Sequence, residues 1–186
     1  MFSVIDYNRH LKSVITYKDY GLHEFKPTLN HLLLIPFENL SFVRKVRLLL
    51  EKIRGGYRVY YFSFVDSVVG YCVVTPGGRR LKKSTPEDIV LGPYYIAPEY
   101  RGNGYAKEMI RMTLSYSSYE YRYAYDWIDR NNISSIKVSE ACGFKECGRL
   151  NVVGLFRRLV ETESGSNIIF RYVRPNRFQC EKKMNQ

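Results

Sequence analysis

The chain has 186 residues, of which 45% are hydrophobic and 25% are charged, a composition typical of one globular domain with a substantial core. No apolar run approaches the ~18 residues needed to span a bilayer, and no signal-peptide core follows the N-terminus, so we expect a cytoplasmic protein without a membrane partner. The formal net charge of +11 suits an anionic partner such as nucleic acid or a phosphorylated small molecule.

The first 40 residues give little pattern. Some alternation in SVITYKDYGLHEF (13–25) fits an early strand. Apolar side chains then recur at helical spacing in SFVRKVRLLLEKIR, which predicts a helix over 41–54. Ser41 is suited to cap this helix, and Gly55-Gly56 is suited to end it.

Three strands are predicted in the next segment. Residues 57–64 and 68–74 flank a short turn and predict an antiparallel hairpin. Residues 75–88 contain two prolines and two glycines, which predicts a loop. The strand IVLGPYYIA (89–97) is interrupted by Gly92-Pro93, and a proline inside a strand indicates an edge, a bulge or a local splay.

The remaining elements complete an alternation of helices and strands. We expect a helix over 105–118, a strand over 121–128, a short helix over 133–142 and further strands within 145–173. In the strand over 121–128, four aromatic residues are expected to share one face: Tyr121, Tyr123, Tyr125 and Trp127. The order predicts a single α/β domain over 1–174, followed by a polar tail over 175–186.

Metal binding is not expected. None of the four cysteines, at positions 72, 142, 147 and 180, forms a C-x-x-C pair, and the three histidines are far from them in the sequence. Reduced thiols are therefore predicted. The basic residues are spread along the chain, and the one dense cluster, at 79–83, is interpreted as a solvated, mobile loop.

The stretch APEYRGNGYA (97–106) lies between a predicted strand and a predicted helix. The first turn of a helix has unpaired N–H groups and the positive end of the helix dipole, so it can bind pyrophosphate. Gly102 and Gly104 allow unusual backbone angles and a close approach of phosphate oxygens. Arg101 adds positive charge or braces the turn. The stretch is neither a Walker loop nor a full G-x-G-x-x-G.

Together with DRNNISSIKVSEACGFKECG (129–148), this stretch resembles the GNAT superfamily of acetyl-CoA-dependent N-acetyltransferases. The pyrophosphate signature of that superfamily, R/Q-x-x-G-x-G/A, is matched by Arg101, Gly104 and Ala106. Its second signature, Asn-x-x-Ser/Ala followed by a short helix and Gly-Phe, is matched by Asn132, Ser135, Gly143 and Phe144. The resemblance covers 57–148 and extends more loosely over 41–56 and 149–174, whereas residues 1–40 match nothing.

The resemblance implies the GNAT acyl-CoA N-acyltransferase fold, an α/β fold with a mixed, mostly antiparallel sheet whose splayed parallel central strands are flanked by helices. The splayed strands would be 89–97 and 121–128, with the pantetheine arm of acetyl-CoA between them. The implied cofactor-binding residues are Tyr95, Ile96, Ala97, Arg101, Gly102, Asn103, Gly104, Tyr105, Ala106, Asn132 and Ser135. A backbone N–H near Ile96 or Ala97 would stabilise the oxyanion. Asn132 is also suited to cap the helix that follows it.

Two catalytic roles remain to be filled. For the base that neutralises the ammonium, we consider Asp88, which shares a strand face with Val90 and Ile96 if pleating is regular. For the acid, many family members carry a tyrosine seven residues after the motif asparagine, but this chain has Ser139 there. A serine can hold a water molecule but is a poor proton donor, so Tyr95 or Tyr125 are alternatives.

The implied function is transfer of an acetyl group from acetyl-CoA to a primary amine. The acceptor stays open among an amino sugar nucleotide, a metabolite amine, an antibiotic, and a protein N-terminus or lysine. The net charge favours an anionic acceptor over a polyamine. Ser139 favours an alternative, a non-catalytic acyl-CoA-binding module. A nucleic-acid-binding protein is less favoured because no such motif appears. A homodimer is compatible with the sequence.

Overall fold

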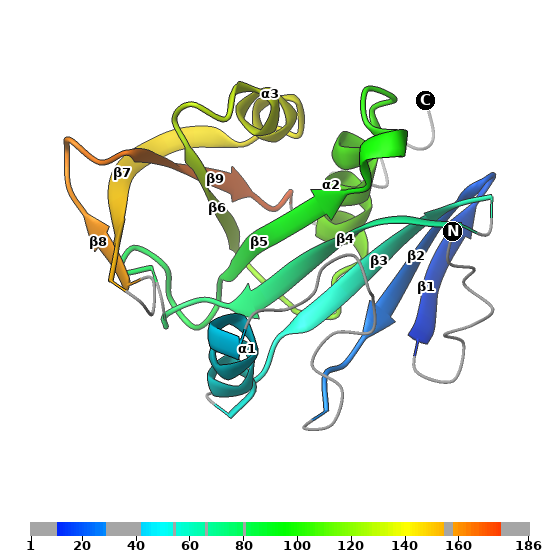
Figure 1. The fold of residues 1–186 in the computed structure, drawn as a ribbon, viewed down its shortest axis with the longest axis horizontal. Coiled ribbons are helices and arrows are strands. Elements are labelled where there is room, and N and C mark those ends of the chain that lie inside the picture. The colour runs from blue at the N-terminus through cyan, green and yellow to red at the C-terminus, as the bar shows by residue number, and fades with distance from the viewer. Residues whose placement is uncertain are drawn as a thin grey trace.

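The computed structural model describes residues 11–28, 42–53, 55–65, 67–79, 81–154 and 158–175. In these ranges, nine strands form one sheet in the order β1-β2-β3-β4-β5-β6-β9-β7-β8 (Figure 1). The strands are β1 Leu11–Tyr17, β2 Tyr20–Phe25, β3 Arg58–Phe64, β4 Ser67–Pro76, β5 Ile89–Ile96, β6 Tyr123–Asp129, β7 Lys145–Val153, β8 Arg158–Glu161 and β9 Asn167–Val173. The helices are α1 Phe42–Ile53, α2 Tyr105–Tyr116 and α3 Ile133–Ala141, and one 3₁₀ turn spans Pro98–Tyr100.

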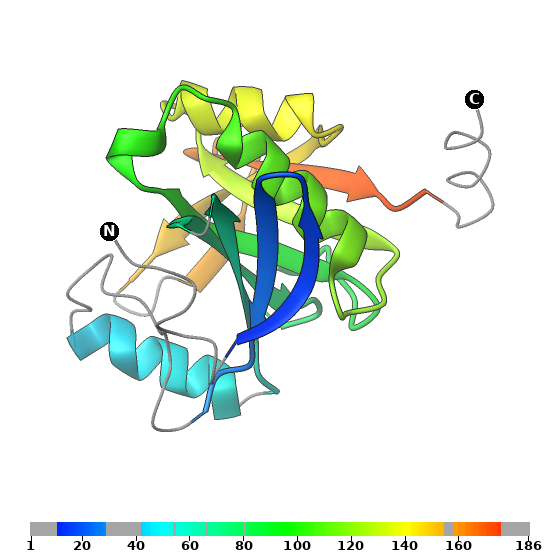
Figure 2. The same ribbon diagram turned by 90° about the vertical axis from the view of Figure 1, so that its right-hand side faces the viewer.

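Helices cover both faces of the sheet. Figure 2 shows α2 and α3 on one face and α1 on the other. Successive residues of a strand point to opposite faces, and β3 follows this rule. Tyr60 and Phe62 pack with Met109 of α2, whereas Val59 and Tyr61 belong to the cluster that contains Leu48 of α1. The sheet is therefore buried on both sides, in agreement with the many apolar residues in its central strands.

Most predicted elements are confirmed. The expected helix over 41–54 is α1, although its proposed cap, Ser41, lies outside the described residues. The hairpin is β3–β4, and the last strands are β7, β8 and β9. The alternation near the N-terminus corresponds to a complete hairpin, β1–β2, that extends the sheet.

The face assigned to Tyr121 is wrong. This residue precedes β6, and its hydroxyl donates a 2.6 Å hydrogen bond to the carbonyl oxygen of Leu114 in α2. Its ring therefore packs on the α2 face, in a different cluster from Tyr123, Tyr125 and Trp127. The alternation expected along the strand does not extend to the residue before it.

The expected splay lies between β5 and β6, the one parallel pair of strands in the described sheet. The two strands pair only at Ile89 with Ala124 and at Val90 with Tyr125. Beyond these positions, the register of β5 against β4 shifts at the Gly92-Pro93 interruption, and β5 and β6 diverge (Figure 1). The prediction of splayed central strands is confirmed, and the gap between them opens toward the first turns of α2 and α3.

Candidate active site

The turn between β5 and α2 has the backbone geometry that its glycines predict. Gly102 and Gly104 have φ angles of 84° and 79°, in the left-handed region that favours glycine. Gly104 is the N-cap residue of the 12-residue helix α2. A Cβ atom at either position would meet no atom within 4 Å. The glycines are thus required by backbone angle, and the surface beside the helix N-terminus is open.

Arg101 and Asn103 brace this turn. The Arg101 Nε atom donates to the Ile96 carbonyl oxygen at 3.0 Å, and its guanidinium lies 5.4 Å from the centroid of the Tyr95 ring. The Asn103 side-chain amide donates to the carbonyl oxygens of Tyr100 and Arg101. Of the two roles considered for Arg101, the structure shows the bracing one.

A cavity of about 620 Å³, here called the helix-tip cavity, lies against this turn. Nine of the expected cofactor-binding residues line it: Tyr95, Ile96, Arg101, Gly102, Gly104, Tyr105, Ala106, Asn132 and Ser135. Asn103 and Ala97 do not. Lys107 and Lys137, which the sequence analysis missed, also line it. Lys107 lies in the first turn of α2 and Lys137 at the middle of α3, so the cavity combines two helix N-termini with two ammonium groups.

The backbone of β5 narrows the choice of oxyanion donor. The Ala97 N–H donates to the Val69 carbonyl oxygen of β4 at 2.9 Å, so it is already engaged. Backbone groups of successive strand residues point to alternate sides. Those of Ile96 and Tyr94 therefore point toward the gap, and the Ile96 carbonyl oxygen indeed accepts from Arg101 rather than from β4. The oxyanion role expected of Ala97 does not fit, whereas Ile96 remains suited to it.

Asn132 caps α3, as the sequence predicts. Its side-chain oxygen accepts hydrogen bonds from the Ser135 N–H at 3.2 Å and the Ser134 hydroxyl at 3.0 Å. Asn132 and Ser135 line both the helix-tip cavity and a second cavity beside it. The start of α3 therefore forms part of the boundary between the two.

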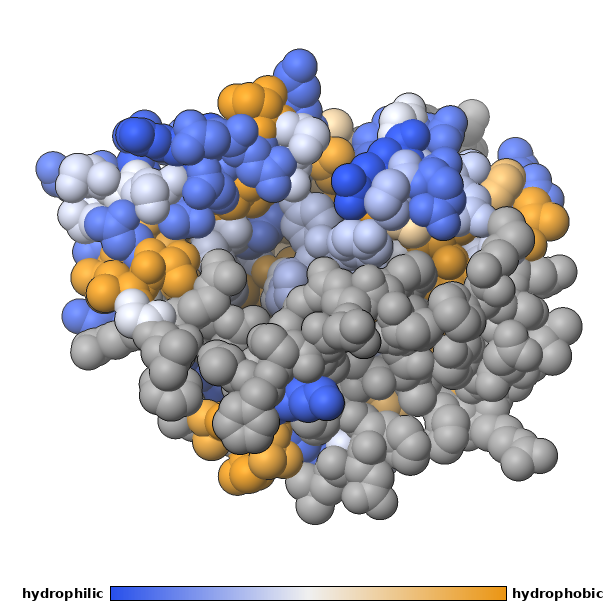
Figure 3. Space-filling view, in the orientation of Figure 1, coloured by the Kyte–Doolittle hydropathy of each residue, from blue (hydrophilic) through white to orange (hydrophobic). Residues whose placement is uncertain are grey.

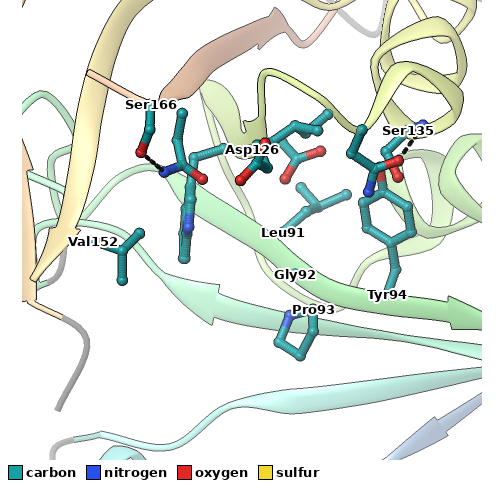
Figure 4. A pocket seen from close by; sticks show the side chains of 13 residues that line it. Leu91, Gly92, Pro93, Tyr94, Asp126, Ser135, Val152 and Ser166 are labelled. Atoms are coloured by element: carbon teal, nitrogen blue, oxygen red, sulfur yellow. Dashed lines mark hydrogen bonds between the residues drawn. The ribbon is translucent and has the colours of Figure 1, made fainter. Parts of the chain in front are cut away.

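The second cavity, here called the gap cavity, has a volume of about 460 Å³ and occupies the space between β5 and β6. Figure 4 places Tyr94 and Ser135 on one side, Val152 and Ser166 on the other, and Asp126 between them. The space-filling view shows a hollow in this part of the described surface (Figure 3). Tyr94 lines both cavities, so the two meet where β5 passes α3.

Tyr94 carries a buried hydroxyl that accepts and donates no hydrogen bond among the described residues. The hydroxyls of Ser135 and Ser139 lie near the Tyr94 hydroxyl but do not have hydrogen-bonding geometry to it. Their proximity lowers the pKa of Tyr94 and so opposes the larger upward shift that burial causes. Burial, and then the negative charge of Asp126, raise the pKa of this phenol. Tyr94 is therefore a protonated, unsatisfied donor at the junction of the two cavities.

Asp126, like Tyr94, is a residue that sequence reasoning missed. Its side chain is buried, and one carboxylate oxygen accepts a 3.0 Å hydrogen bond from the Ser139 hydroxyl. Burial raises the pKa of Asp126 to about 7, against the lowering effect of hydrogen bonds from Ser139 and from the Trp127 backbone. An acidic residue between two aromatic residues in the strand YAYDWID was the available signal in the sequence.

The structure does not bring the three expected catalytic residues together. Ser139 is fully buried, donates to Asp126 and lines neither cavity, so it does not occupy the role of the family tyrosine. The Tyr95 ring stacks on Tyr71, at 6.0 Å between centroids, in the cluster on the α1 face. Tyr125 likewise belongs to a cluster away from α2 and α3, and its hydroxyl donates to the Lys83 carbonyl oxygen.

Asp88 lies at the wrong end of β5 to act as a base. Its carboxylate accepts from the N–H and hydroxyl of Thr85, at 2.7 and 2.9 Å, and from the Tyr123 N–H at 3.1 Å. It lines neither cavity. The residue instead ties the preceding loop to the start of β6, where β5 and β6 are still paired. The predicted base role is therefore not supported by this position.

The basic cluster at 79–83 also lies away from the cavities where it is described. The Lys83 ammonium donates to the Cys147 carbonyl oxygen at 2.8 Å, and the Lys83 N–H donates to the Glu161 carboxylate at 3.0 Å. Lys83 thus contacts β7 and β8 rather than either cavity. Within the described ranges, no three His, Cys, Asp or Glu residues gather as metal ligands, and no helix is long and apolar enough to cross a membrane.

Comparison with known proteins agrees with this geometry. The model of the acetyltransferase (GNAT) family matches residues 27–144, which is more than half of the chain. The chain belongs to this family. A search of curated proteins found no match. The GNAT family explains why a glycine turn, a helix N-terminus and two splayed parallel strands occur together here.

Solved GNAT structures share the fold at low sequence identity. An acetyltransferase from Salmonella typhimurium that modifies the N-terminal serine of ribosomal protein L7/L12 is 10% identical, with a TM-score of 0.59 over 88% of this chain and all of that one. The putative acetyltransferase yncA from the same organism, solved with acetyl-CoA, is 14% identical, with a TM-score of 0.53 over 82% and 93%. A spermidine N-acetyltransferase from Vibrio cholerae, described as dodecameric, is 15% identical, with a TM-score of 0.56 over 84% and 95%.

Proposed function

We propose that this GNAT protein transfers the acetyl group of acetyl-CoA to a primary amine. One observation carries the proposal: the helix-tip cavity and the gap cavity meet at Tyr94 and Asn132. One end of the combined space has a positively polarised helix N-terminus, and the other contains a buried carboxylate. This arrangement suits an anionic acetyl donor at one end and an amine at the other.

The helix-tip cavity is suited to the donor. The backbone N–H groups at the start of α2 would bind the pyrophosphate, with Lys107 and Lys137 adding positive charge. The pantetheine arm would lie along β5, where the backbone groups of Tyr94 and Ile96 point into the gap. An extended arm that pairs with an open strand edge satisfies those groups as an added strand does. The thioester would then lie close to the gap cavity.

The chemistry is an acyl substitution. The neutral amine attacks the thioester carbonyl carbon, and the Ile96 N–H donates to the oxyanion that forms. The intermediate collapses with loss of a proton from the nitrogen and cleavage of the C–S bond, which leaves the amide, and the CoA thiolate takes up that proton. The Tyr94 hydroxyl donates a hydrogen bond to this sulfur. Because the pKa of a tyrosine lies above that of a thiol and burial raises the pKa of Tyr94 further, Tyr94 stabilises the thiolate by hydrogen bonding rather than by full proton transfer.

The test measures donor binding and turnover separately. Isothermal titration gives the Kd for acetyl-CoA, and release of free thiol across a panel of amines gives turnover. Gly104→Glu places a carboxylate at the helix N-terminus and is expected to weaken acetyl-CoA binding by at least about 100-fold. Gly154→Glu is the matched control, because Gly154 is also exposed, has a φ of 73° and has no atom within 4 Å of an added Cβ.

Two results would contradict the proposal. Unchanged acetyl-CoA affinity in Gly104→Glu would mean that the donor binds elsewhere. Tight acetyl-CoA binding by the unmodified protein, without thiol release for any amine class, would favour a non-catalytic acyl-CoA-binding module.

A further inference from the structure

The gap cavity is acidic in a strongly basic protein. The chain has 29 lysines and arginines and 18 acidic residues. Yet the charged residues that line this cavity are Asp126 and Asp129, and no described lysine or arginine does so. The local charge is therefore opposite to the net charge. An acceptor is selected by the groups it contacts, so the cavity rather than the net charge indicates the class of acceptor.

Asp126 has no cationic partner among the described residues. The titratable groups that face it are Cys72 on β4, Tyr94 on β5 and Cys142 after α3, and their pKa values are all raised by burial and by the charge of Asp126. All three are neutral near pH 7. Its own strand adds only Asp129, another acid whose carboxylate accepts from the Asn131 N–H at 2.8 Å. Buried carboxylates are otherwise almost always paired.

The rest of the cavity suits a compact, partly apolar molecule. Leu91, Pro93, Trp127, Ile128 and Val152 contribute apolar surface. Ser166 and Asn167, whose side chains hydrogen-bond to each other at 3.0 Å, form the polar end near β9 (Figure 4). The volume lies in the range of about 300–1,000 Å³ common for small-molecule sites. None of the described residues that line the cavity is a lysine or arginine that could pair with a phosphate.

We propose that the gap cavity is the acceptor site and that it binds a small, partly apolar primary amine as its cation, with Asp126 as the counter-ion. This inference rests on the proposed acetyltransferase function. It disfavours the anionic acceptors, such as an amino sugar nucleotide, that the net charge favours. The ammonium supplies the positive charge that the buried carboxylate lacks.

Asp126 then has a second role in the same step. The ammonium transfers one proton to the carboxylate, the neutral nitrogen attacks the thioester, and the proton leaves to solvent after the amide has formed. A base is most effective when its pKa lies near the working pH, and burial raises the pKa of Asp126 to about 7. Activity must therefore fall as the pH drops below about 7, because Asp126 becomes protonated before the amine binds.

The experiment compares 2-phenylethylamine, a cationic amine with an apolar body, with glucosamine 6-phosphate, an amine that carries a phosphate. We expect kcat/KM to be at least about 10-fold higher for 2-phenylethylamine. Asp126→Asn keeps the shape of the side chain and is expected to reduce kcat/KM for this amine by about 100-fold or more, with the acetyl-CoA Kd unchanged. Glu140→Gln, the same chemical change at an exposed position of α3, is the control.

A pH profile separates a role in the reaction from a role in folding. The unmodified protein is expected to lose kcat/KM below pH about 7, and Asp126→Asn is expected to lack that limb. Thermal unfolding reports whether Asp126→Asn still folds. If Asp126→Asn does not fold, Ser139→Ala gives a second test that keeps the carboxylate. Loss of the Ser139 hydrogen bond raises the pKa of Asp126, so the acid limb is expected to move to higher pH.

The outcomes distinguish this inference from the proposed function. Faster transfer to glucosamine 6-phosphate, or full activity of Asp126→Asn with its acid limb intact, overturns the acceptor assignment while acetyl transfer itself stands. Acetyl-CoA binding without thiol release for any amine overturns both.

Discussion

Replacement of Tyr94 by phenylalanine is expected to change stability and activity in opposite directions. The substitution removes one hydroxyl and keeps the ring between β5 and α3. That hydroxyl is buried and has no hydrogen-bonding partner among the described residues. An unsatisfied buried polar group costs about 1–3 kcal/mol, so its removal is expected to leave the free energy of unfolding unchanged or raise it by about 1 kcal/mol. If the hydroxyl stabilises the leaving sulfur, kcat is expected to fall by about 10²–10³-fold.

Tyr121→Phe is the matched control. The Tyr121 hydroxyl is also buried in the α2 face of the core, but it donates to the Leu114 carbonyl oxygen and lines neither cavity. Its loss leaves that oxygen unsatisfied and is expected to destabilise the fold by about 1–3 kcal/mol without a change in kcat. Urea unfolding and steady-state kinetics on both variants give the comparison. The reasoning on Tyr94 is refuted if Tyr94→Phe is destabilised and retains full kcat.

Three further predictions concern carboxylates. Ser139→Ala removes a hydrogen bond that lowers the pKa of Asp126, so the acid limb of kcat/KM is expected to move up by about one pH unit. Burial raises the pKa of Asp126 from 3.8 to about 7, so the folded protein binds this proton more tightly than the unfolded chain does. The resulting contribution to the free energy of unfolding is complete below pH 3.8 and is lost as the pH rises through 7. Denaturant unfolding is thus expected to show that the free energy of unfolding of the unmodified protein, relative to that of Asp126→Asn, falls by up to about 4 kcal/mol between pH 3.8 and pH 7. A difference between the two proteins that does not change with pH would contradict this prediction. Asp88→Asn weakens three hydrogen bonds and is expected to lower the free energy of unfolding by about 1.5–3 kcal/mol. The pH dependence of turnover is expected to stay the same. Loss of the acid limb in this variant would instead indicate that Asp88 is the catalytic base.

The proposed donor-binding half of the site was predictable because its signals are local. A glycine that needs a left-handed φ before a helix, and an asparagine that caps the next helix, each act within a few residues of themselves. Gly104 and Asn132 accordingly lie where the sequence indicates. The splay was also indicated locally, by a proline inside an apolar strand. Those features depend on backbone conformation, which short sequence patterns encode well.

The proposed catalytic role of Tyr94 was not predictable, because it depends on which face of β5 each residue occupies. Regular pleating places Asp88, Val90 and Ile96 on one face. The register shift against β4 breaks this rule, since Val90 packs with Tyr125 whereas Ile96 packs on the α2 face. The same shift aims Tyr94 rather than Tyr95 at α3. A one-residue change of register moves every later side chain to the other face, and the Gly92-Pro93 interruption indicates an irregularity without specifying which face the later residues occupy.

The carboxylate of Asp88 links the loop before β5 to the start of β6. It connects a loop residue, Thr85, to the backbone of Tyr123 at the only point where the two strands are paired. Ile96 is eight residues farther along, or about 26 Å of extended chain. A small rotation of β5 about Asp88 would therefore displace Ile96 by a larger distance and widen the gap at that end. Substitutions in the loop over 77–88 are therefore expected to change how far β5 and β6 separate, although no described side chain of that loop lines either cavity.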